Sequence, residues 1–271
     1  MLVSKIKVAI FDVDGTLFDY RNQKVHESTV KAIQCLREKG VTIVVATSRS
    51  YAELSEDILT RVAADYYVAA SGHCIQDTLG RSMFSERFTY EQVERVKELA
   101  LKYDAGLTLK YEQYNCLYTH PMEMQAIYSN IGDPRCCSVY CTPMNQHQSE
   151  LPVGFAIRAE NGTRALICEE LSRYPNDYRM ELYKNGIVAD IYNPFANKMT
   201  ALAHLIRRLG LSAENCIAFG DGKNDVEMIR WAGIGVAMGN AHEDVKAVAD
   251  AVCGASWEDG IATYLCSLDL Q

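Results

Sequence analysis

The sequence has no apolar run of about 20 residues, the length that a membrane-spanning helix needs, so we do not expect a membrane protein. Residues 1–7 lead directly into a strand-like segment and lack the apolar core of a signal peptide. Basic residues are in the minority, with 27 Lys and Arg against 35 Asp and Glu, whereas nucleic-acid binding needs dense positive charge. We therefore expect a cytoplasmic protein with no nucleic-acid or membrane partner, although a local site can still bind a small anion.

The sequence also lacks the paired C-x-x-C spacing that is typical of zinc sites. Ten cysteines are present, but in a chain of 271 residues that we place in the cytoplasm they do not indicate a disulfide framework. Several lie in apolar runs, where a thiol acts as a small hydrophobic group. For the group formed by Cys136, Cys137, Cys141 and His147, we favour free thiols over a structural metal.

What is present is the composition of a globular protein, with 48% hydrophobic and 23% charged residues. In the first part of the chain, buried strands predicted over 6–11, 41–46 and 66–70 alternate with helices over 25–39 and 51–63. Strands that alternate with helices through short connections are typical of a parallel sheet with right-handed crossovers.

The pattern changes between about residues 82 and 188, where short strands and tight turns such as 184–186 favour an antiparallel α+β sheet. After about residue 190 the strand–helix alternation returns. We therefore predict an α/β fold: a Rossmann-like core of residues 1–81 and 189–271, interrupted by an inserted α+β domain over 82–188. Within the insert, residues 120–150 show no clear pattern.

Polar side chains gather where the predicted parallel strands end. Asp12 and Asp14 follow the first strand in the D-V-D-G-T motif of residues 12–16. Two carboxylates at this spacing can face one crevice, where they suit nucleophilic or acid–base chemistry and attract Mg²⁺. Thr47, at the end of the second strand, offers a hydroxyl beside a helix N-terminus, which suits a phosphate. The simpler alternatives are a capped turn and an N-cap at Thr47 or Ser48.

Another strand end carries the G-D-G-K-N-D segment of residues 220–225. Asp221 and Asp225 in this segment can complete a Mg²⁺ site with Asp12. A turn-forming loop is the alternative, and the ligand pattern of an EF-hand is missing. Lys198 opens the preceding helix, where a positive charge opposes the helix dipole. We therefore expect Lys198 to neutralise a phosphate. The alternative is an ordinary solvated lysine on the surface.

These motifs, in this order, resemble those of the haloacid dehalogenase (HAD) superfamily of phosphohydrolases: D-x-D-x-T, Thr47, Lys198 and G-D-x-x-N-D. The resemblance covers the whole chain. The position of the insert, between the second and third motifs, is similar to the Cof-type subgroup with a C2B α/β cap. The V-A-M-G-N-A and D-G-I-A sequences near the C-terminus are similar as well. The resemblance implies a Rossmann-like core with a movable cap.

The resemblance also implies roles for the matching residues. Asp12 is expected to be the nucleophile that forms an aspartyl-phosphate, and Asp14 the general acid that then acts as base. Mg²⁺ is expected to be the cofactor, held by Asp12, the backbone carbonyl of Asp14 and Asp221. Asn224 and Asp225 are expected to be supporting ligands or to lie next to the ligands.

The phosphoryl oxygens are expected to contact Thr47 and Lys198, and Ser48, Arg49 and Asn224 are further candidates for substrate binding. For Arg49, a surface salt bridge is an equally good interpretation. The chain departs from the subgroup at three places, where it carries Ser48 after Thr47, Met199 after Lys198, and the sequence S-G-H at residues 71–73.

Together these features predict a Mg²⁺-dependent phosphatase of small phosphorylated metabolites, such as sugar phosphates, pyridoxal phosphate or FMN. A phosphotransferase or phosphomutase of the same superfamily is the first alternative, because it shares the covalent step. A non-catalytic binding protein is the second, although such proteins usually lose a catalytic carboxylate and none is lost here. The sequence leaves open whether the chain is a monomer or a homodimer.

Overall fold

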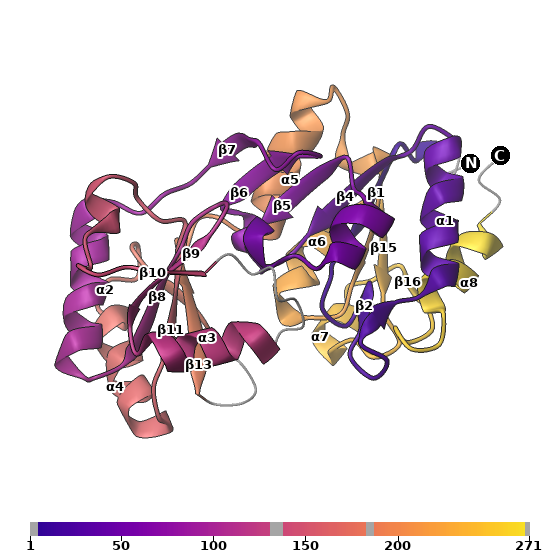
Figure 1. The fold of residues 1–271 in the computed structure, drawn as a ribbon. Coiled ribbons are helices and arrows are strands. Elements are labelled where there is room, and N and C mark those ends of the chain that lie inside the picture. The colour runs from indigo at the N-terminus through magenta and orange to yellow at the C-terminus, as the bar shows by residue number, and fades with distance from the viewer. Residues whose placement is uncertain (1–4, 131–137, 183–186, 269–271) are drawn as a thin grey trace. The chain divides into compact units, whose positions relative to one another are not determined.

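The structure is a computed structural model that describes residues 5–130, 138–182 and 187–268 (Figure 1). Contacts divide the chain into two units. The first comprises Met1–Ser48, Glu56–Arg81 and Asn197–Gln271, and the second comprises Arg49–Ser55 and Ser82–Ala196. Within the described ranges, no helix is both long and apolar enough to span a membrane.

A mostly parallel sheet has the strand order β16-β15-β14-β1-β4-β5-β6-β7, and its strands from β16 to β6 form the frame of the first unit. Neighbouring strands from β16 to β5 pair in parallel, whereas β6 returns antiparallel to β5. Strands β1, β14 and β15 are buried along their whole length, as expected for apolar strands of a parallel sheet. The strands are β1 (Val8–Phe11), β4 (Thr42–Ala46), β5 (Tyr66–Ala69), β6 (Cys74–Asp77), β14 (Cys216–Gly220), β15 (Ile234–Ala237), β16 (Ala251–Val252) and β7 (Ser82–Ser85), with which the chain enters the second unit.

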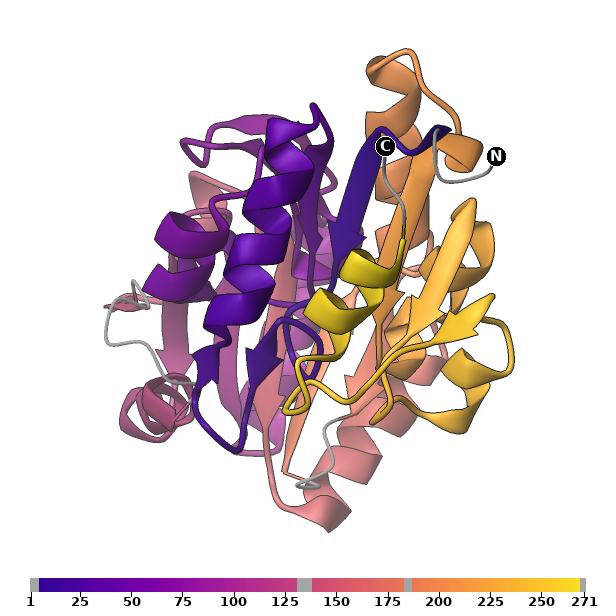
Figure 2. The same cartoon turned by 90° about the vertical axis from the view of Figure 1, so that its right-hand side faces the viewer.

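Two groups of helices cover this sheet. Helix α1 (Glu27–Glu38) contacts α8 (Gly260–Ser267), and the two lie side by side in Figure 2. Helix α5 (Lys198–Arg208) contacts α6 (Val226–Trp231), which also packs against β14 and β15 and against the short helix α7 (Glu243–Lys246). The predicted α/β core is therefore confirmed.

The prediction of one continuous helix over 51–63 is wrong. Tyr51–Glu53 forms a 3-10 turn, η2, and Asp57–Val62 forms a separate π-helical turn, η3. The carboxylate of Glu53 accepts the backbone N–H of Ser50 at 2.8 Å, and Leu54 has extended backbone, so the first turn ends there. The first turn consequently belongs to the second unit, whereas η3 belongs to the first.

A six-stranded sheet with the order β10-β9-β8-β11-β13-β12 forms the second unit. Its strands pair antiparallel, apart from β10, which is parallel to β9. This is the predicted inserted α+β cap domain. Its elements are α2 (Tyr90–Lys102), β8 (Gly106–Lys110), β9 (Asn115–Thr119), α3 (Pro121–Asn130), β10 (Ser138–Tyr140), β11 (Gly154–Arg158), α4 (Asn161–Ser172), β12 (Arg179–Leu182) and β13 (Val188–Tyr192).

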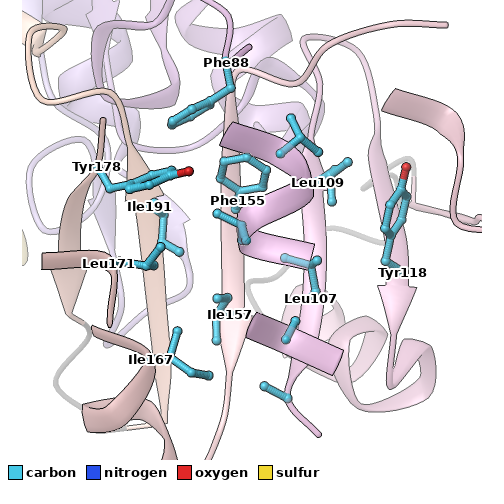
Figure 3. Packing of buried hydrophobic residues seen from close by; sticks show 14 of the residues in the cluster. Phe88, Leu107, Leu109, Tyr118, Phe155, Ile157, Ile167, Leu171, Tyr178 and Ile191 are labelled. Carbon is cyan, nitrogen blue, oxygen red and sulfur yellow. The ribbon is translucent and has the colours of Figure 1, made fainter. Parts of the chain in front are cut away.

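The core of this unit lies between its sheet and helices α2 and α4. Alternate side chains of the central strands, Leu107 and Leu109 of β8 with Phe155 and Ile157 of β11, point to the same face and are buried. Figure 3 shows them meeting apolar residues of the helices. The period of two along each strand therefore leaves the other face of the sheet to Thr108, Lys110 and their neighbours.

Strand β13 (Val188–Tyr192) continues this sheet beyond the boundary predicted at residue 189. It pairs with both β11 and β12, and the first unit resumes only at Asn197. The predicted turn at 184–186 lies outside the described residues. Helix α3 and strand β10 occupy part of the stretch 120–150, which shows no clear pattern in the sequence.

The cysteine prediction needs a correction. Cys116 of β9 and Cys141 form a disulfide, so Cys141 is not a free thiol. The ring of His147 is buried and hydrogen-bonded to a tyrosine and a glutamate of the same unit, which gives it a structural role without a metal. Cys136 and Cys137 lie outside the described residues.

Candidate active site

The ends of three neighbouring strands bring the predicted catalytic residues to one edge of the sheet. Phe11, the last residue of β1, pairs with Phe219 of β14 on one side and with Val45 of β4 on the other. Asp12 and Asp221 therefore leave adjacent strands at the same level. Carboxyl ends of parallel strands are the usual place of ligand sites in open α/β sheets.

Lys198 is the buried charge at the centre of this edge. Its Nζ lies 2.6 Å from Oδ1 of Asp12 and 2.7 Å from Oδ1 of Asp225, and only 2% of its side chain is exposed. It is the first residue of α5, which begins there because the Asn197 side chain accepts the backbone N–H of Thr200 at 2.8 Å. Lys198 is thus no solvated surface lysine.

Gly72 lets the start of α5 come this close to the end of β5. Its φ is +96°, and a Cβ there would lie 2.2 Å from the backbone oxygen of Asn197. The two residues before it, Ala70 and Ser71, also have positive φ, at +47° and +53°. Glycine adopts positive φ readily, but Ala70 and Ser71 do so at a cost, so backbone strain is concentrated at the edge that carries the site.

Asp225 organises the acidic loop after β14. Its Oδ2 accepts the backbone N–H groups of Asp221 at 3.0 Å and Gly222 at 2.9 Å, while its Oδ1 faces Lys198. One carboxylate oxygen from each of Asp12, Asp221 and Asp225 lies within 4.8 Å of the other two. The loop therefore gathers three acidic groups around one point.

The electrostatics of the group follow from this crowding. Burial raises the pKa of Asp12 well above its ordinary value, and the neighbouring Asp225 adds to the rise, while Lys198 opposes it. Burial and Asp225 also raise the pKa of Asp221, to about 6. For Lys198, burial alone would lower the pKa, but Asp12 and Asp225 outweigh it and raise the pKa. One lysine does not offset three carboxylates, so the group attracts further positive charge.

Asp14 is half-buried and accepts a hydrogen bond from the hydroxyl of Tyr20. Tyr20 lies in a small hairpin of β2 (Phe18–Asp19) and β3 (Lys24–Val25). The buried carboxylate of Asp19 fixes this hairpin by accepting the backbone N–H of Arg21 at 2.8 Å and the side-chain amide of Asn22 at 2.6 Å. Sequence reasoning missed Tyr20, because nothing in its local pattern marks it.

The remaining predicted residues differ in their surroundings. Thr47 is buried at the end of β4, and its backbone oxygen accepts the N–H of Ser71 at 3.0 Å. Ser48 is half-buried and Asn224 is exposed. Arg49 lies in the second unit, where its guanidinium donates to the backbone oxygen of Glu53 at 3.2 Å. Arg49 is buried, so it does not lie at the surface as that interpretation expected.

Two further residues touch the acidic group and were missed. The Thr16 hydroxyl donates to Oδ1 of Asp221 at 3.2 Å, and the Asn240 amide lies 3.3 Å from Oδ2 of Asp221. Thr16 belongs to the D-x-D-x-T motif, and Asn240 to the V-A-M-G-N-A sequence, so the resemblance contained a signal for both.

A model of the haloacid dehalogenase-like hydrolases matches residues 9–265. The chain belongs to this family. It is therefore an enzyme, a HAD-type phosphatase of the Cof-type subgroup, as the motifs at the strand ends indicate.

Relatives of this HAD-type chain include 5-amino-6-(5-phospho-D-ribitylamino)uracil phosphatase YcsE of Bacillus subtilis, which is 28% identical over 95% of this chain and 93% of its own length. The HMP-PP phosphatase of Yersinia pseudotuberculosis is 25% identical over 96% of this chain and 94% of its own length. A chloroplastic protein of Arabidopsis thaliana named endoribonuclease YBEY is 24% identical, but the chain spans only 46% of its length.

Solved structures share the fold over nearly the whole chain. A haloacid dehalogenase-like hydrolase from Bacteroides thetaiotaomicron has a TM-score of 0.84 at 21% identity and covers 97% of this chain and 99% of its own. A structure described as a HAD subclass IIB sugar phosphatase has a TM-score of 0.81 at 24% identity and covers 98% and 100%. At 21–24% identity, these likenesses establish the fold of the chain.

Proposed function

We propose that this HAD phosphatase is Mg²⁺-dependent and hydrolyses small phosphorylated metabolites through an aspartyl-phosphate formed on Asp12. The observation that carries the proposal is the buried contact of Asp12 with Lys198, beside Asp221 and Asp225. Relatives named for phosphorylated small molecules, a ribitylamino-uracil phosphate and HMP-PP, support the substrate class. We extend the class to sugar phosphates and to cofactor phosphates such as pyridoxal phosphate and FMN.

The donor set fits Mg²⁺. Hard divalent cations prefer oxygen ligands and commonly bind through one or two carboxylates together with substrate phosphate. Oxygens of Asp12, Asp221 and Asp225 lie close together, and two of these side chains are buried. We assign Asp12, Asp221 and the Asp14 carbonyl as the ligands, with Asp225 and Asn224 as neighbours. When bound, Mg²⁺ would offset the negative charge that repels nucleophile and phosphate.

The chemistry of the chain's own residues follows. An oxygen of the Asp12 carboxylate attacks phosphorus, the bond to the leaving oxygen breaks, and Asp14 gives its proton to that oxygen. Asp14 then takes a proton from water, which attacks the phosphorus of the aspartyl-phosphate and releases phosphate and the free Asp12 carboxylate. A covalent intermediate of this kind divides one difficult displacement into two easier ones.

Lys198 and Thr47 have positioning and charge-stabilising roles in this scheme. The ammonium group of Lys198 lies between Asp12 and Asp225 and is fixed before any substrate arrives. Preorganised positive charge stabilises the developing charge of phosphoryl transfer without further rearrangement. We assign the Thr47 hydroxyl, and with it Ser48, to the phosphoryl oxygens. Arg49 is assigned to the substrate.

Phosphate release from a panel of metabolite phosphates, with Mg²⁺ and with EDTA, tests the proposal. We expect release that needs Mg²⁺ and falls by several orders of magnitude in Asp12→Asn. Asp65→Asn is the matched control, because Asp65 is another carboxylate of the first unit that accepts a backbone N–H, that of Ile43 at 2.7 Å, away from the site. Equal activity of wild type and Asp12→Asn would reject Asp12 as nucleophile. Transfer to a sugar hydroxyl that exceeds hydrolysis would point to a phosphotransferase instead.

A further inference from the structure

We propose that Asn240 is a positioning residue of the metal site, which fixes the carboxylate of Asp221 against the loop that carries the nucleophile. The inference rests on the Mg²⁺ site of the proposed function. The side-chain amide of Asn240 donates to the backbone oxygen of Gly15 at 2.8 Å and lies 3.3 Å from Oδ2 of Asp221. One NH₂ group therefore bridges two segments that both supply ligands.

The other end of the same amide is anchored as well. Its Oδ1 accepts the backbone N–H of Ser256 at 2.9 Å, in the segment before α8. The loop that carries Asn240 is tied to the acidic loop by its backbone, because His242 N–H donates to the backbone oxygen of Asp221 at 2.9 Å. The amide thus has a fixed orientation, and its O and N ends are assigned by their partners.

Both oxygens of the Asp221 carboxylate then have a donor. Thr16 Oγ1 donates to Oδ1 at 3.2 Å, and Asn240 Nδ2 faces Oδ2 at 3.3 Å. Two donors on opposite oxygens restrict rotation of the carboxylate about its last side-chain bond. Both donors are neutral, so they hold Asp221 in place without cancelling the negative charge that attracts a cation.

The tight contact with Gly15 shows how closely the two loops approach. Gly15 has φ +85°, and a Cβ there would lie only 2.4 Å from Oδ2 of Asp221. Oδ2 of Asp221, which Asn240 contacts, is therefore also the atom that lies closest to Gly15 in the loop that carries Asp12. A side chain that bridges Gly15 and Asp221 sets the spacing between Asp12 and Asp221, and Mg²⁺ is strict about such spacing.

The test is direct titration of the full-length protein with Mg²⁺ in a calorimeter, without substrate. Partners that orient a ligand typically contribute about 10- to 100-fold to metal affinity, so we expect Asn240→Ala to raise the Mg²⁺ dissociation constant by about that factor. Thr16→Val should weaken binding in the same direction. If Asn240→Ala does not fold, Asn240→Ser serves instead, because a hydroxyl one atom closer to the backbone does not reach Asp221.

Asn215→Ala is the matched control. Asn215 is also half-buried in the first unit, at the end of the 3-10 turn Ala213–Asn215, and it donates to the backbone oxygen of Lys5 at 3.1 Å and accepts the N–H of Ser212 at 3.0 Å. It does not contact Asp221. If Asn240 only held loops together, the two substitutions would act alike, so we expect both to lower the melting temperature and only Asn240→Ala to weaken Mg²⁺ binding.

The inference is overturned if Asn240→Ala binds Mg²⁺ within about threefold of wild type, or if Asn215→Ala weakens binding as much. It is also overturned if the wild type binds no Mg²⁺. The failure of the proposed function is a separate result: a wild type that binds Mg²⁺ but releases no phosphate from any substrate rejects the phosphatase chemistry, and the role of Asn240 at the metal site stands.

Discussion

Nζ of Lys198 lies 2.6 Å from Oδ1 of Asp12, although the two residues are 186 positions apart in the chain. The contact requires the end of β1 and the start of α5 to lie at the same place. Strand β1 ends directly before Asp12, and α5 begins at Lys198. Both groups are buried, so neither is screened by water. The first unit thus brings an apolar strand and a capped helix together around a cluster of buried charges. We attribute this cluster to the function of the protein rather than to its stability.

Replacing Lys198 with Met should therefore remove activity and also destabilise the fold. Asp12 and Asp225 would both face a buried space without their positive partner, and the loss of one member of a buried ion pair costs about 3–5 kcal/mol. We expect a loss of that size in the free energy of unfolding, measured by urea titration. The double variant Lys198→Met with Asp12→Asn should recover part of it, whereas an unchanged double variant would contradict the pairing.

Tyr20→Phe should slow turnover without unfolding the protein. The hydroxyl of Tyr20 donates to Asp14, so its loss frees the carboxyl group that we assign as acid and base. General acid–base catalysis contributes about 100- to 10,000-fold, and poorer positioning should cost about tenfold in kcat with little change in KM. Tyr140→Phe is the matched control, since its side chain is 52% exposed against 53% for Tyr20. Equal kcat in both variants would leave Tyr20 without this role.

The parallel core was predictable because its strands are short apolar segments at the expected places. Strands β1 and β14 are buried throughout. The D-V-D-G-T motif directly follows β1, and the G-D-G-K-N-D segment begins at the last residue of β14. Strand topology alone then brings Asp12 and Asp221 to one edge. The place where a strand ends can be recognised from the neighbouring residues in the sequence. For this reason much of the candidate site could be inferred from the sequence.

Contacts between distant segments could not be inferred in the same way. Asn240 and Gly15 are 225 positions apart, and no periodicity links them. The segment 51–63 has a helical pattern, but the contact of Glu53 with Ser50 divides it. Strand β6 mixes polar and apolar residues, so no apolar run marked it. In each case tertiary contacts outweighed the local signal.

The hairpin that carries Tyr20 should give a pH-dependent contribution to stability through Asp19. Burial alone would raise the pKa of Asp19, but the hydrogen bond with His26 and those with Asn22 and Arg21 outweigh it and lower the pKa below 3.8. A carboxyl group with a lower pKa in the folded state stabilises the fold above its unfolded pKa. That contribution is lost as the pH falls through the folded value.

Asp19→Asn should accordingly destabilise the protein at pH 7 by about 1–3 kcal/mol, as expected for hydrogen bonds to a charged group. The difference from wild type should persist down to about pH 5 and shrink below about pH 4. Urea titrations at several pH values measure this. Asp244→Asn, at a side chain that is 60% exposed, should show no such trend. A difference that stays constant to pH 3 would mean that Asp19 acts through packing rather than through its charge.

In the second unit, Lys110 and Asp190 form a buried ion pair on the face of the sheet opposite its apolar core. Lys110 Nζ lies 2.7 Å from Oδ2 of Asp190, with side-chain exposures of 4% and 2%, and Tyr192 donates to the same oxygen at 3.0 Å. Burial alone would lower the pKa of Lys110, but Asp190 and Glu53 outweigh it and raise the pKa. The lysine therefore stays charged and compensates the negative charge of the buried Asp190 carboxylate.

Lys110→Met should therefore destabilise the protein by about 3–5 kcal/mol, because it leaves the carboxylate of Asp190 buried without its cation. Lys110→Met combined with Asp190→Leu should recover part of this loss, since matched apolar residues can replace a buried ion pair, while Glu53, 3.9 Å from Lys110 Nζ, also loses this cation. Calorimetric unfolding of the single and double variants measures the difference. If the loss of stability in the double variant equals the sum of the losses in the two single variants, the two side chains act independently. The ion pair would then not explain why both side chains are buried.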